Sequence, residues 1–453
     1  QHNMTDLTQG SLLRHIWTMA LPMMIGMFVQ SLYLFVDLYF VADLGAAAIA
    51  GVSAATNLTM LIMALTQMLN VGCVALIARY TGAKEHQHAN VVFQQAMLMG
   101  AALAVLTLAL GFALSDNYMQ LMTADPEVQQ QAQQFLHAYL PGLALMFVSS
   151  AIGAALRAVG VVKPAMMVQL VTVLLNIILA PVLIAGWGTG YALGVFGAGL
   201  ASSIAVAVGV ALLWLYFLKS DHSVLQTPKQ WRFDAKVWRQ ITAIGLPAGG
   251  EFALMFVFTA FVYWVIKDFG TATQAAFGIG NRILQAMMMP AMALSFAMPA
   301  IVGQNYGAGH ADRVRQCFNI GLKQMAFVML PLFLLSQWLA HPLMLAFTDD
   351  LKVAAEGELF LHIISLNFIT IVLVFSCSGV FQGLGNTWPS LASSAVRIFA
   401  FILPVLWLSS RSDFSPAMVW YGSAASVLVQ GLMSFKLLRW QLRTKLANKV
   451  TAA

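Results

Sequence analysis

Residues 14–40, RHIWTMALPMMIGMFVQSLYLFVDLYF, form a long apolar run in which Asp37 is the only acidic residue and Pro22 the only proline. About 20 apolar residues suffice for a helix to cross a bilayer. A charged side chain inside such a helix is costly and marks a candidate functional site. The run therefore predicts a transmembrane helix, with Asp37 as the first candidate for its chemistry.

The composition of the whole chain extends this prediction. Of 453 residues, 60% are apolar and 9% are charged, whereas soluble proteins carry about 25% charged residues. Composition therefore excludes a soluble enzyme, a nucleic-acid-binding protein and a disordered protein. We predict an all-α polytopic membrane protein with twelve transmembrane helices. They are expected at residues 14–40, 46–78, 91–115, 128–156, 164–186, 192–218, 237–266, 272–303, 314–338, 353–381, 389–409 and 415–438.

The chain also repeats itself at an offset of 225 residues. Chance similarity between apolar helices does not readily keep proline, glycine, aspartate and histidine in one register. Six helices per half, an even number, predict two lobes related by a pseudo-two-fold axis along the membrane normal. We expect an N-lobe at 1–218, a cytoplasmic linker at 219–236 and a C-lobe at 237–453. The matching pairs are Pro22 and Pro247, Asp43 and Asp268, Gly82 and Gly307, His137 and His362, Gly160 and Gly385, and Pro164 and Pro389.

The distribution of charge predicts the orientation. Most of the 23 Lys and Arg residues lie in the two tails or in the even-numbered connections between the expected helices. The odd-numbered connections hold only Lys267, Lys352 and Arg411 among basic residues, together with most of the acids. Positive charge marks the cytoplasmic side of a membrane protein. Both termini are therefore expected in the cytoplasm, and the basic net charge is not interpreted as an anion-binding signal.

One face of the first helix is polar. Gln30, Tyr33 and Asp37 are spaced by three and four residues and so share a helix face. A carboxyl group in a partly dry cavity can exchange a proton near physiological pH. It could instead ligate Na⁺ or serve as a structural carboxylate, and the polarity of its face favours a functional role. In the fifth expected helix, Thr172 and Asn176 lie on one stripe that either meets Asp37 or joins helices.

The C-terminal half carries ionisable residues of its own. Glu251, Arg282 and Arg397 lie inside expected helices. Glu251 corresponds in the repeat to Gly26, so the ionisable sites of the two halves differ. Glu251 is either a second protonation site or the partner of one of the two arginines. No nucleotide-binding or hydrolytic motif appears, so energy must come from an ion gradient, and no cofactor or metal is expected.

These features resemble the MATE (multidrug and toxic compound extrusion) family, within it the DinF-like branch, over nearly the whole chain. The marks in the N-terminal half are ALPMMIGMFVQSLYLFVDLYFVADLG (20–45), ARYTGAKEHQHA (78–89) and LRAVGVVKP (156–164). Those in the C-terminal half are GLPAGG (245–250), VGQNYGAGHADR (302–313) and FQGLGNTWP (381–389).

The resemblance implies roles for single residues. Asp37 is implied to be the cation-coupling carboxylate, Asn176 its hydrogen-bonding partner and Pro22 the bending point of the first helix. Gln30, Asn57 and Tyr139 are implied members of the same polar network. Relatives carry a second acid where this chain has Ala180, and those with a C-lobe Na⁺ site carry an acid inside the tenth helix. Both acids are absent here, which favours H⁺ over Na⁺.

Together these observations predict a secondary active multidrug antiporter in a bacterial inner membrane. We expect a monomer, with no nucleic-acid partner, that exports amphipathic or cationic drugs in exchange for H⁺, with Na⁺ as the alternative ion. Protonation of Asp37 and bending of the first helix near Pro22 would drive alternating access. The alternative transport function is a flippase for lipids or lipid-linked glycans. A membrane-embedded enzyme would need a paired acid and base at one depth, and the sequence supplies none.

Overall fold

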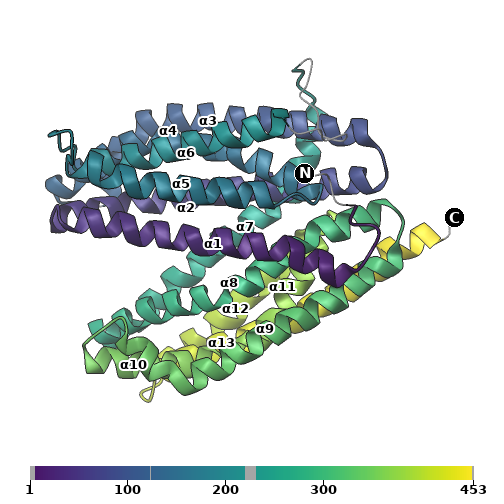
Figure 1. Cartoon of the computed structure of the whole chain (residues 1–453). Coiled ribbons are helices and arrows are strands. Elements are labelled where there is room, and N and C mark those ends of the chain that lie inside the picture. The colour runs from purple at the N-terminus through teal and green to yellow at the C-terminus, as the bar shows by residue number, and fades with distance from the viewer. Residues whose placement is uncertain (1–5, 123, 220–230, 451–453) are drawn as a thin grey trace. The chain divides into compact units, whose positions relative to one another are not determined.

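The computed structural model describes residues 6–122, 124–219 and 231–450, which contain thirteen α-helices and one 3-10 turn, Lys267–Phe269 (η1) (Figure 1). The side chains of residues 33–35, 38, 56, 57, 122 and 447–450 lie outside that description. These described ranges contain no strand. The helices are α1 (Leu12–Ala42), α2 (Ala46–Gly82), α3 (His86–Met122), α4 (Pro126–Ala158), α5 (Lys163–Ile184), α6 (Val195–Lys219), α7 (Ala235–Ile266), α8 (Thr271–Gly307), α9 (Ala311–Leu345), α10 (Leu351–Ile364), α11 (Asn367–Leu384), α12 (Trp388–Ser409) and α13 (Pro416–Val450).

Eleven helices in the described chain are long and apolar enough to cross a membrane. The eleven do not include α10, which has 14 residues, or α13, which falls short by composition. A helix can cross the bilayer because its backbone polar groups are hydrogen-bonded within the helix itself. The expected class, an all-α protein that crosses the membrane many times, is confirmed.

The span expected at 353–381 is divided into α10 and α11. Gln337 of α9 donates a hydrogen bond from Nε2 to the carbonyl oxygen of His362 at 2.9 Å. In an uninterrupted helix that carbonyl would accept from the N–H of Leu366. This N–H instead donates to the carbonyl of Ile363 at 3.2 Å. A side chain from a neighbouring helix thus competes for the backbone and breaks the span.

Turns at positions 225 residues apart have the same backbone geometry in the two halves. Gly45 and Gly270 precede α2 and α8 with φ angles of 108° and 105°, a region that favours glycine. Asp125 and Asp350 cap α4 and α10, and each carboxylate accepts a hydrogen bond from the N–H two residues later at 3.0 Å. The 225-residue offset therefore describes geometry as well as sequence.

The chain packs as two compact units, one mainly Leu21–Gly245 and the other Leu7–Ala20 with Leu246–Ala453. These units differ from the expected lobes in one respect. The beginning of α1 belongs to the second unit, and the beginning of α7 belongs to the first. In both helices the change falls directly before a proline of the repeat, Pro22 in α1 and Pro247 in α7.

Hydrogen bonds hold the segment directly before α1 within the second unit. Arg313 donates from Nη1 to the carbonyl of Gly10 at 2.9 Å and from Nη2 to that of Leu7 at 3.1 Å. Asn305 donates from Nδ2 to the same Leu7 carbonyl at 3.0 Å. Bonds from a guanidinium are stronger than neutral ones, so this segment is firmly attached.

The beginning of α7 is held within the first unit in a different way. The side-chain oxygen of Gln95 on α3 accepts from the N–H of Asp234 at 3.0 Å and from Nε1 of Trp238 at 2.8 Å. Nearby, α7 crosses α2 at very short range. A Cβ atom added to Gly245 would lie 1.9 Å from the carbonyl oxygen of Met68. Small residues permit such close helix crossings in membranes.

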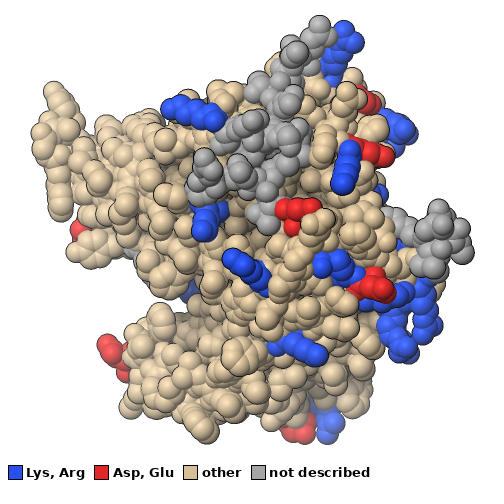
Figure 2. Space-filling view, turned by 45° about the vertical axis from the view of Figure 1, so that its right-hand side comes forward, with Lys and Arg blue, Asp and Glu red and all other residues tan. Residues whose placement is uncertain are grey.

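The surface carries many large apolar side chains. Trp338 is 80% exposed and Phe327 is 75% exposed on α9. On the face in Figure 2 most of the surface is uncharged, and most of the charged side chains in view are Lys and Arg. Such a surface suits contact with lipid along the helices and with water at their ends.

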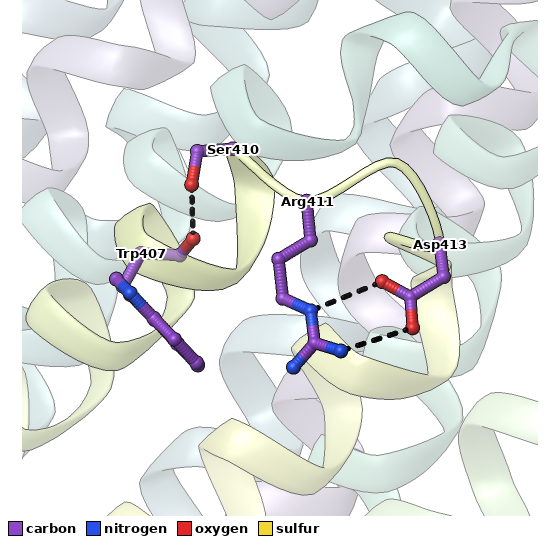
Figure 3. Close-up of polar contacts among 4 residues, drawn as sticks. All are labelled: Trp407, Ser410, Arg411 and Asp413. Atoms are coloured by element: carbon purple, nitrogen blue, oxygen red, sulfur yellow. Dashed lines mark hydrogen bonds and ion pairs between the residues drawn. The ribbon is translucent and has the colours of Figure 1, made fainter.

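The connection between α12 and α13 illustrates how one span ends (Figure 3). The hydroxyl of Ser410 donates to the carbonyl of Trp407 at 2.6 Å and satisfies an acceptor at the end of the helix. Arg411 lies 3.2 Å from Asp413, Nε to Oδ1, and its guanidinium lies 5.6 Å from the centre of the Trp407 ring. Tryptophan beside charged residues is typical of a membrane–water interface.

Candidate functional site

Asp37 lies on α1, and two other helices of the same unit bring hydrogen-bond donors to it. Asn176 of α5 donates from Nδ2 to Oδ1 of Asp37 at 2.9 Å. The hydroxyl of Ser202 on α6 lies 3.5 Å from the second carboxylate oxygen, Oδ2. Both oxygens of the carboxylate therefore face neutral donors on separate helices.

The surroundings of this carboxylate are buried. Asn176 is fully buried and Ser202 is 1% exposed. The side-chain oxygen of Asn176 has no hydrogen-bond partner among the described residues. A buried oxygen without a partner is rare and calls for an explanation. The group of Asp37, Asn176 and Ser202, which we call the Asp37 cluster, can hold a proton on the carboxyl or a small cation between its oxygens.

Two further predicted residues, Gln30 and Tyr139, make contacts within the same unit. Gln169 of α5 donates through its amide to the side-chain oxygen of Gln30 on α1, which joins the two helices on the polar face. Tyr139 of α4 lies close enough to Asp37 for an electrostatic interaction and packs its ring against Phe135 at 5.5 Å between centres. Both contacts lie within the first unit.

The other predicted members are placed differently. The hydroxyl of Thr172 donates to the carbonyl of Val168 in its own helix at 2.8 Å, so it satisfies α5 rather than Asp37. The side chains of Tyr33 and Asn57 lie outside the described residues. Pro22 is buried inside α1, which continues as a helix on both sides of it.

Ser202 was not predicted from the sequence. Its only signal is the adjacent pair Ser202 and Ser203 in an otherwise apolar helix. The second serine has a different use, because its hydroxyl donates to the carbonyl of Ala138 at 2.6 Å. Serine pairs in membrane helices commonly join helices, so composition alone does not separate the two roles.

The second unit contains a cavity of about 240 Å³. Glu251 of α7 and Arg397 of α12 both line it, together with aromatic side chains that include Phe258, Phe277 and Trp420. The guanidinium of Arg397 lies 4.7 Å from the centre of the Phe258 ring, a cation–π contact. The sequence indicates three candidate ionisable residues inside the helices of this half, and the structure thus brings two of them, Glu251 and Arg397, to one cavity.

Arg282 is not one of them. Its side chain is exposed, while the preceding residue, Asn281, lines the cavity. Arg282 itself is not among the residues that line the cavity. Within the described chain no ion pair joins Glu251 to Arg282 or to Arg397. Of the two alternatives for Glu251, a pairing with one of these arginines is therefore not observed.

Comparison with known proteins identifies one family. The sequence pattern of the family described as MatE matches residues 22–182 and again residues 247–408. The two matches begin at Pro22 and Pro247, which are 225 residues apart. The family pattern therefore matches the chain twice, at the same offset as the internal repeat.

Individual relatives are similar along most of their length. A protein of Shewanella oneidensis named FAD transporter is 23% identical over 88% of each chain. A probable multidrug resistance protein of Bacillus subtilis, YoeA, is 24% identical over 94% of each chain. Among solved structures, a MOP superfamily transporter from Pyrococcus furiosus matches with a TM-score of 0.91 at 23% identity, over 97% of this chain and 98% of the other. That likeness establishes a common fold.

Proposed function

The chain belongs to the MatE family, whose members are membrane transporters and not enzymes, and on this premise we propose that it is a secondary active antiporter. It exports amphipathic, often cationic, small molecules in exchange for H⁺ by alternating access. The names of relatives such as the probable multidrug resistance protein of Bacillus subtilis support the substrate class.

The Asp37 cluster carries the proposal. A carboxylate among buried neutral donors binds a proton or a cationic drug, but it cannot neutralise both at once. Protonation removes the negative charge that holds the drug, so the two ligands compete for one region. Proton uptake by Asp37 would therefore release drug, and release of the proton would prepare the site for the next molecule.

Pro22 supplies the proposed movement. A proline inside a helix removes one backbone hydrogen bond and permits a bend. Pro22 lies where α1 passes from one compact unit to the other, on the helix that carries Asp37. Bending there would change the space around Asp37 after it takes up a cation.

Na⁺ is the alternative coupling ion. The free side-chain oxygen of Asn176 beside the Asp37 carboxylate offers the kind of ligand that hard cations take. A tight site would need more oxygens, and Ala180 stands one turn after Asn176 where an acid would add them. This difference favours H⁺.

The proposed setting is a bacterial inner membrane, with the transporter acting as a monomer and both termini in the cytoplasm. The bias of Lys and Arg toward the tails and the even-numbered connections supports this orientation. Small-molecule drugs and the lipid bilayer are its proposed partners.

Drug resistance in cells tests the proposal. A drug-sensitive bacterium that expresses the wild type should tolerate more ethidium than one with the Asp37→Asn variant, which should resemble the empty vector. Asp43→Asn is the matched control, because this exposed aspartate lies beyond the end of the same helix. Normal resistance in a strain with wild-type amounts of Asp37→Asn in its membrane would contradict the mechanism.

Export of FAD is a second candidate, favoured by the name of the Shewanella oneidensis relative. FAD is an anion, so Asp37 would repel it and could not be its binding partner. Efflux of FAD from loaded vesicles that persists in Asp37→Asn would support this candidate over the export of cations.

A further inference from the structure

The cavity of the second unit holds two opposite charges that do not neutralise each other. One carboxylate oxygen of Glu251, Oε1, is buried and has no hydrogen-bond partner, while the hydroxyl of Ser390 bonds the carboxylate. The Nε atom of Arg397 is likewise buried without a partner. No ion pair joins the two in the described chain. Both residues are half-buried, and charges that are largely removed from water are usually paired, so each can accept a partner of the opposite sign.

Two neutral groups of the same cavity are also unsatisfied. Trp420 is 2% exposed, and its Nε1 donor has no partner. Gln430 is 5% exposed; it donates to Ser394 at 3.1 Å, but its side-chain oxygen has no partner. Both residues line the cavity, so it carries an unsatisfied donor and an unsatisfied acceptor in its wall besides the two charges.

The walls between these polar groups are aromatic. The rings of Phe277 and Trp420 stack with 5.6 Å between centres and 9° between planes, and the ring of Phe360 meets Trp420 edge-on at 4.8 Å. Phe258 lies under the guanidinium of Arg397. All four rings line the cavity. Such walls favour a flat ring system as the apolar part of a ligand.

The charges are particular to the C-terminal half. At the 225-residue offset, Glu251 corresponds to Gly26 and Arg397 to Thr172, both uncharged. In the other direction, Asp37 corresponds to Val262 and Asn176 to Phe401, both buried in the core of the second unit. The two halves have therefore acquired different polar sites, and neither site is inherited from the repeat.

We propose that this cavity is a binding site for a small aromatic zwitterion, a molecule that carries an ammonium and a carboxylate on one ring system. The ammonium pairs with Glu251 and the carboxylate with Arg397. A cation alone would satisfy Glu251 but leave Arg397 unpaired, and an anion would do the reverse. The cavity of about 240 Å³ lies below the usual range for drug-sized ligands, about 300–1,000 Å³, which limits the ligand to one or two fused rings.

Three indole compounds of similar size test the charge requirement. Tryptophan is a zwitterion, tryptamine is a cation and indole-3-propionate is an anion at neutral pH. Isothermal titration calorimetry of the purified full chain in detergent measures the binding of each. We expect tryptophan to bind at least about tenfold more tightly than either singly charged compound, because each of them leaves a buried charge unpaired.

Two variants make the test specific. Arg397→Gln should make tryptamine the tightest of the three ligands, and Glu251→Gln should make indole-3-propionate the tightest. A misfolded protein cannot gain affinity in this way. Arg439→Gln is the matched control, since Arg439 also lies over an aromatic ring, Phe435, but not in the cavity. It should leave the order of affinities unchanged.

The outcomes separate this proposal from the antiport mechanism. Binding at equilibrium needs no ion gradient, and the Asp37→Asn variant should bind tryptophan as the wild type does. Equal binding of the three compounds, binding of none, or a parallel loss for all three in Arg397→Gln and Glu251→Gln would overturn the proposal. Loss of coupled drug export with tryptophan binding intact would concern the Asp37 cluster alone.

Discussion

At the scale of single residues, the two donors on Asp37 differ in geometry. Asn176 lies 2.9 Å from one carboxylate oxygen, near the ideal length, and Ser202 lies 3.5 Å from the other. Hydrogen bonds weaken steeply as they lengthen. Of these two donors, Asn176 should therefore have the larger effect on the state of Asp37 and Ser202 the smaller.

This difference predicts an order of effects. Asn176→Ala removes a bond to a charged group, worth about 1.5–3 kcal/mol, and should lower the rate of drug export about tenfold or more. Ser202→Ala should lower it by less than about threefold, because a contact at 3.5 Å contributes little. Initial rates of ethidium efflux at equal expression measure both. A larger loss in Ser202→Ala than in Asn176→Ala would contradict the assignment.

The sequence predicts some of these residues better than others. Asp37 is visible because a lone acid interrupts an apolar run, and Asn176 because it lies on a polar stripe. Ser202 escapes prediction because serine is common in membrane helices without a functional role. That Arg397 rather than Arg282 shares the cavity with Glu251 depends on helix rotation. A sequence without known contacts does not fix that rotation.

At the scale of helices, α1 combines a proline with membership of two compact units. Pro22 has no N–H, so the carbonyl of Thr18 lacks its usual helical partner. Arg313 of the second unit holds the segment directly before α1, and α1 belongs to that unit only as far as Ala20. The longer part of α1, which carries Asp37, belongs to the first unit. The helix is therefore weakest where it passes between the units.

Replacement of Pro22 by alanine should stabilise the protein but restrict the bending of α1. Pro22→Ala restores the hydrogen bond to Thr18, and proline inside a helix costs about 3 kcal/mol relative to alanine. We expect a higher melting temperature in detergent but slower drug export. Pro141→Ala in α4, an exposed proline inside a helix of the first unit, is the control and should leave export unchanged. Unchanged export in Pro22→Ala would show that α1 need not bend.

A second prediction concerns the crossing of α7 and α2. Gly245→Ala would place a Cβ atom 1.9 Å from the carbonyl oxygen of Met68. This oxygen belongs to the backbone, so α2 or α7 would have to shift to relieve the clash. Overpacking of this kind costs about 1–3 kcal/mol. Thermal unfolding of the purified protein should show a clear loss of stability.

Gly153→Ala in α4 is the control for this test, because nothing lies within 4 Å of its added Cβ. It should be neutral or stabilising by up to about 1 kcal/mol, since alanine favours helix over glycine. Equal melting temperatures for Gly245→Ala and the wild type would mean that the two helices do not cross as closely as described.

At the scale of the whole molecule, the sequence alone shows the internal repeat, which predicts two similar halves, and the charge bias, which predicts the orientation. Residue pairs such as Pro22 and Pro247 recur because both halves need the same turns and kinks. The break between α10 and α11 was not readable, because it depends on a side chain of α9 that bonds the backbone of a later helix. The assignment of the beginnings of α1 and α7 to the opposite units likewise depends on tertiary contacts. The relation of the two lobes by an axis along the membrane normal stays a prediction.

The orientation in the membrane can be tested with single cysteines. The three native cysteines are buried, so they should react little with a thiol reagent. In whole cells, a membrane-impermeant maleimide should label Asp349→Cys but label Lys84→Cys only after permeabilisation. Both positions are exposed. The opposite pattern would reverse the assignment of the cytoplasmic face.

The central claim is that drug and ion exchange through Asp37. The most direct test uses purified protein in liposomes that contain a pH-sensitive dye, with an imposed proton or sodium gradient and added ethidium. We predict drug-triggered proton movement in the wild type and none in Asp37→Asn, with Asp43→Asn as control. Drug movement driven by sodium alone would transfer the coupling to Na⁺. Proton movement that survives Asp37→Asn, or no coupled movement under either gradient, would contradict the claim, and the latter would favour a flippase.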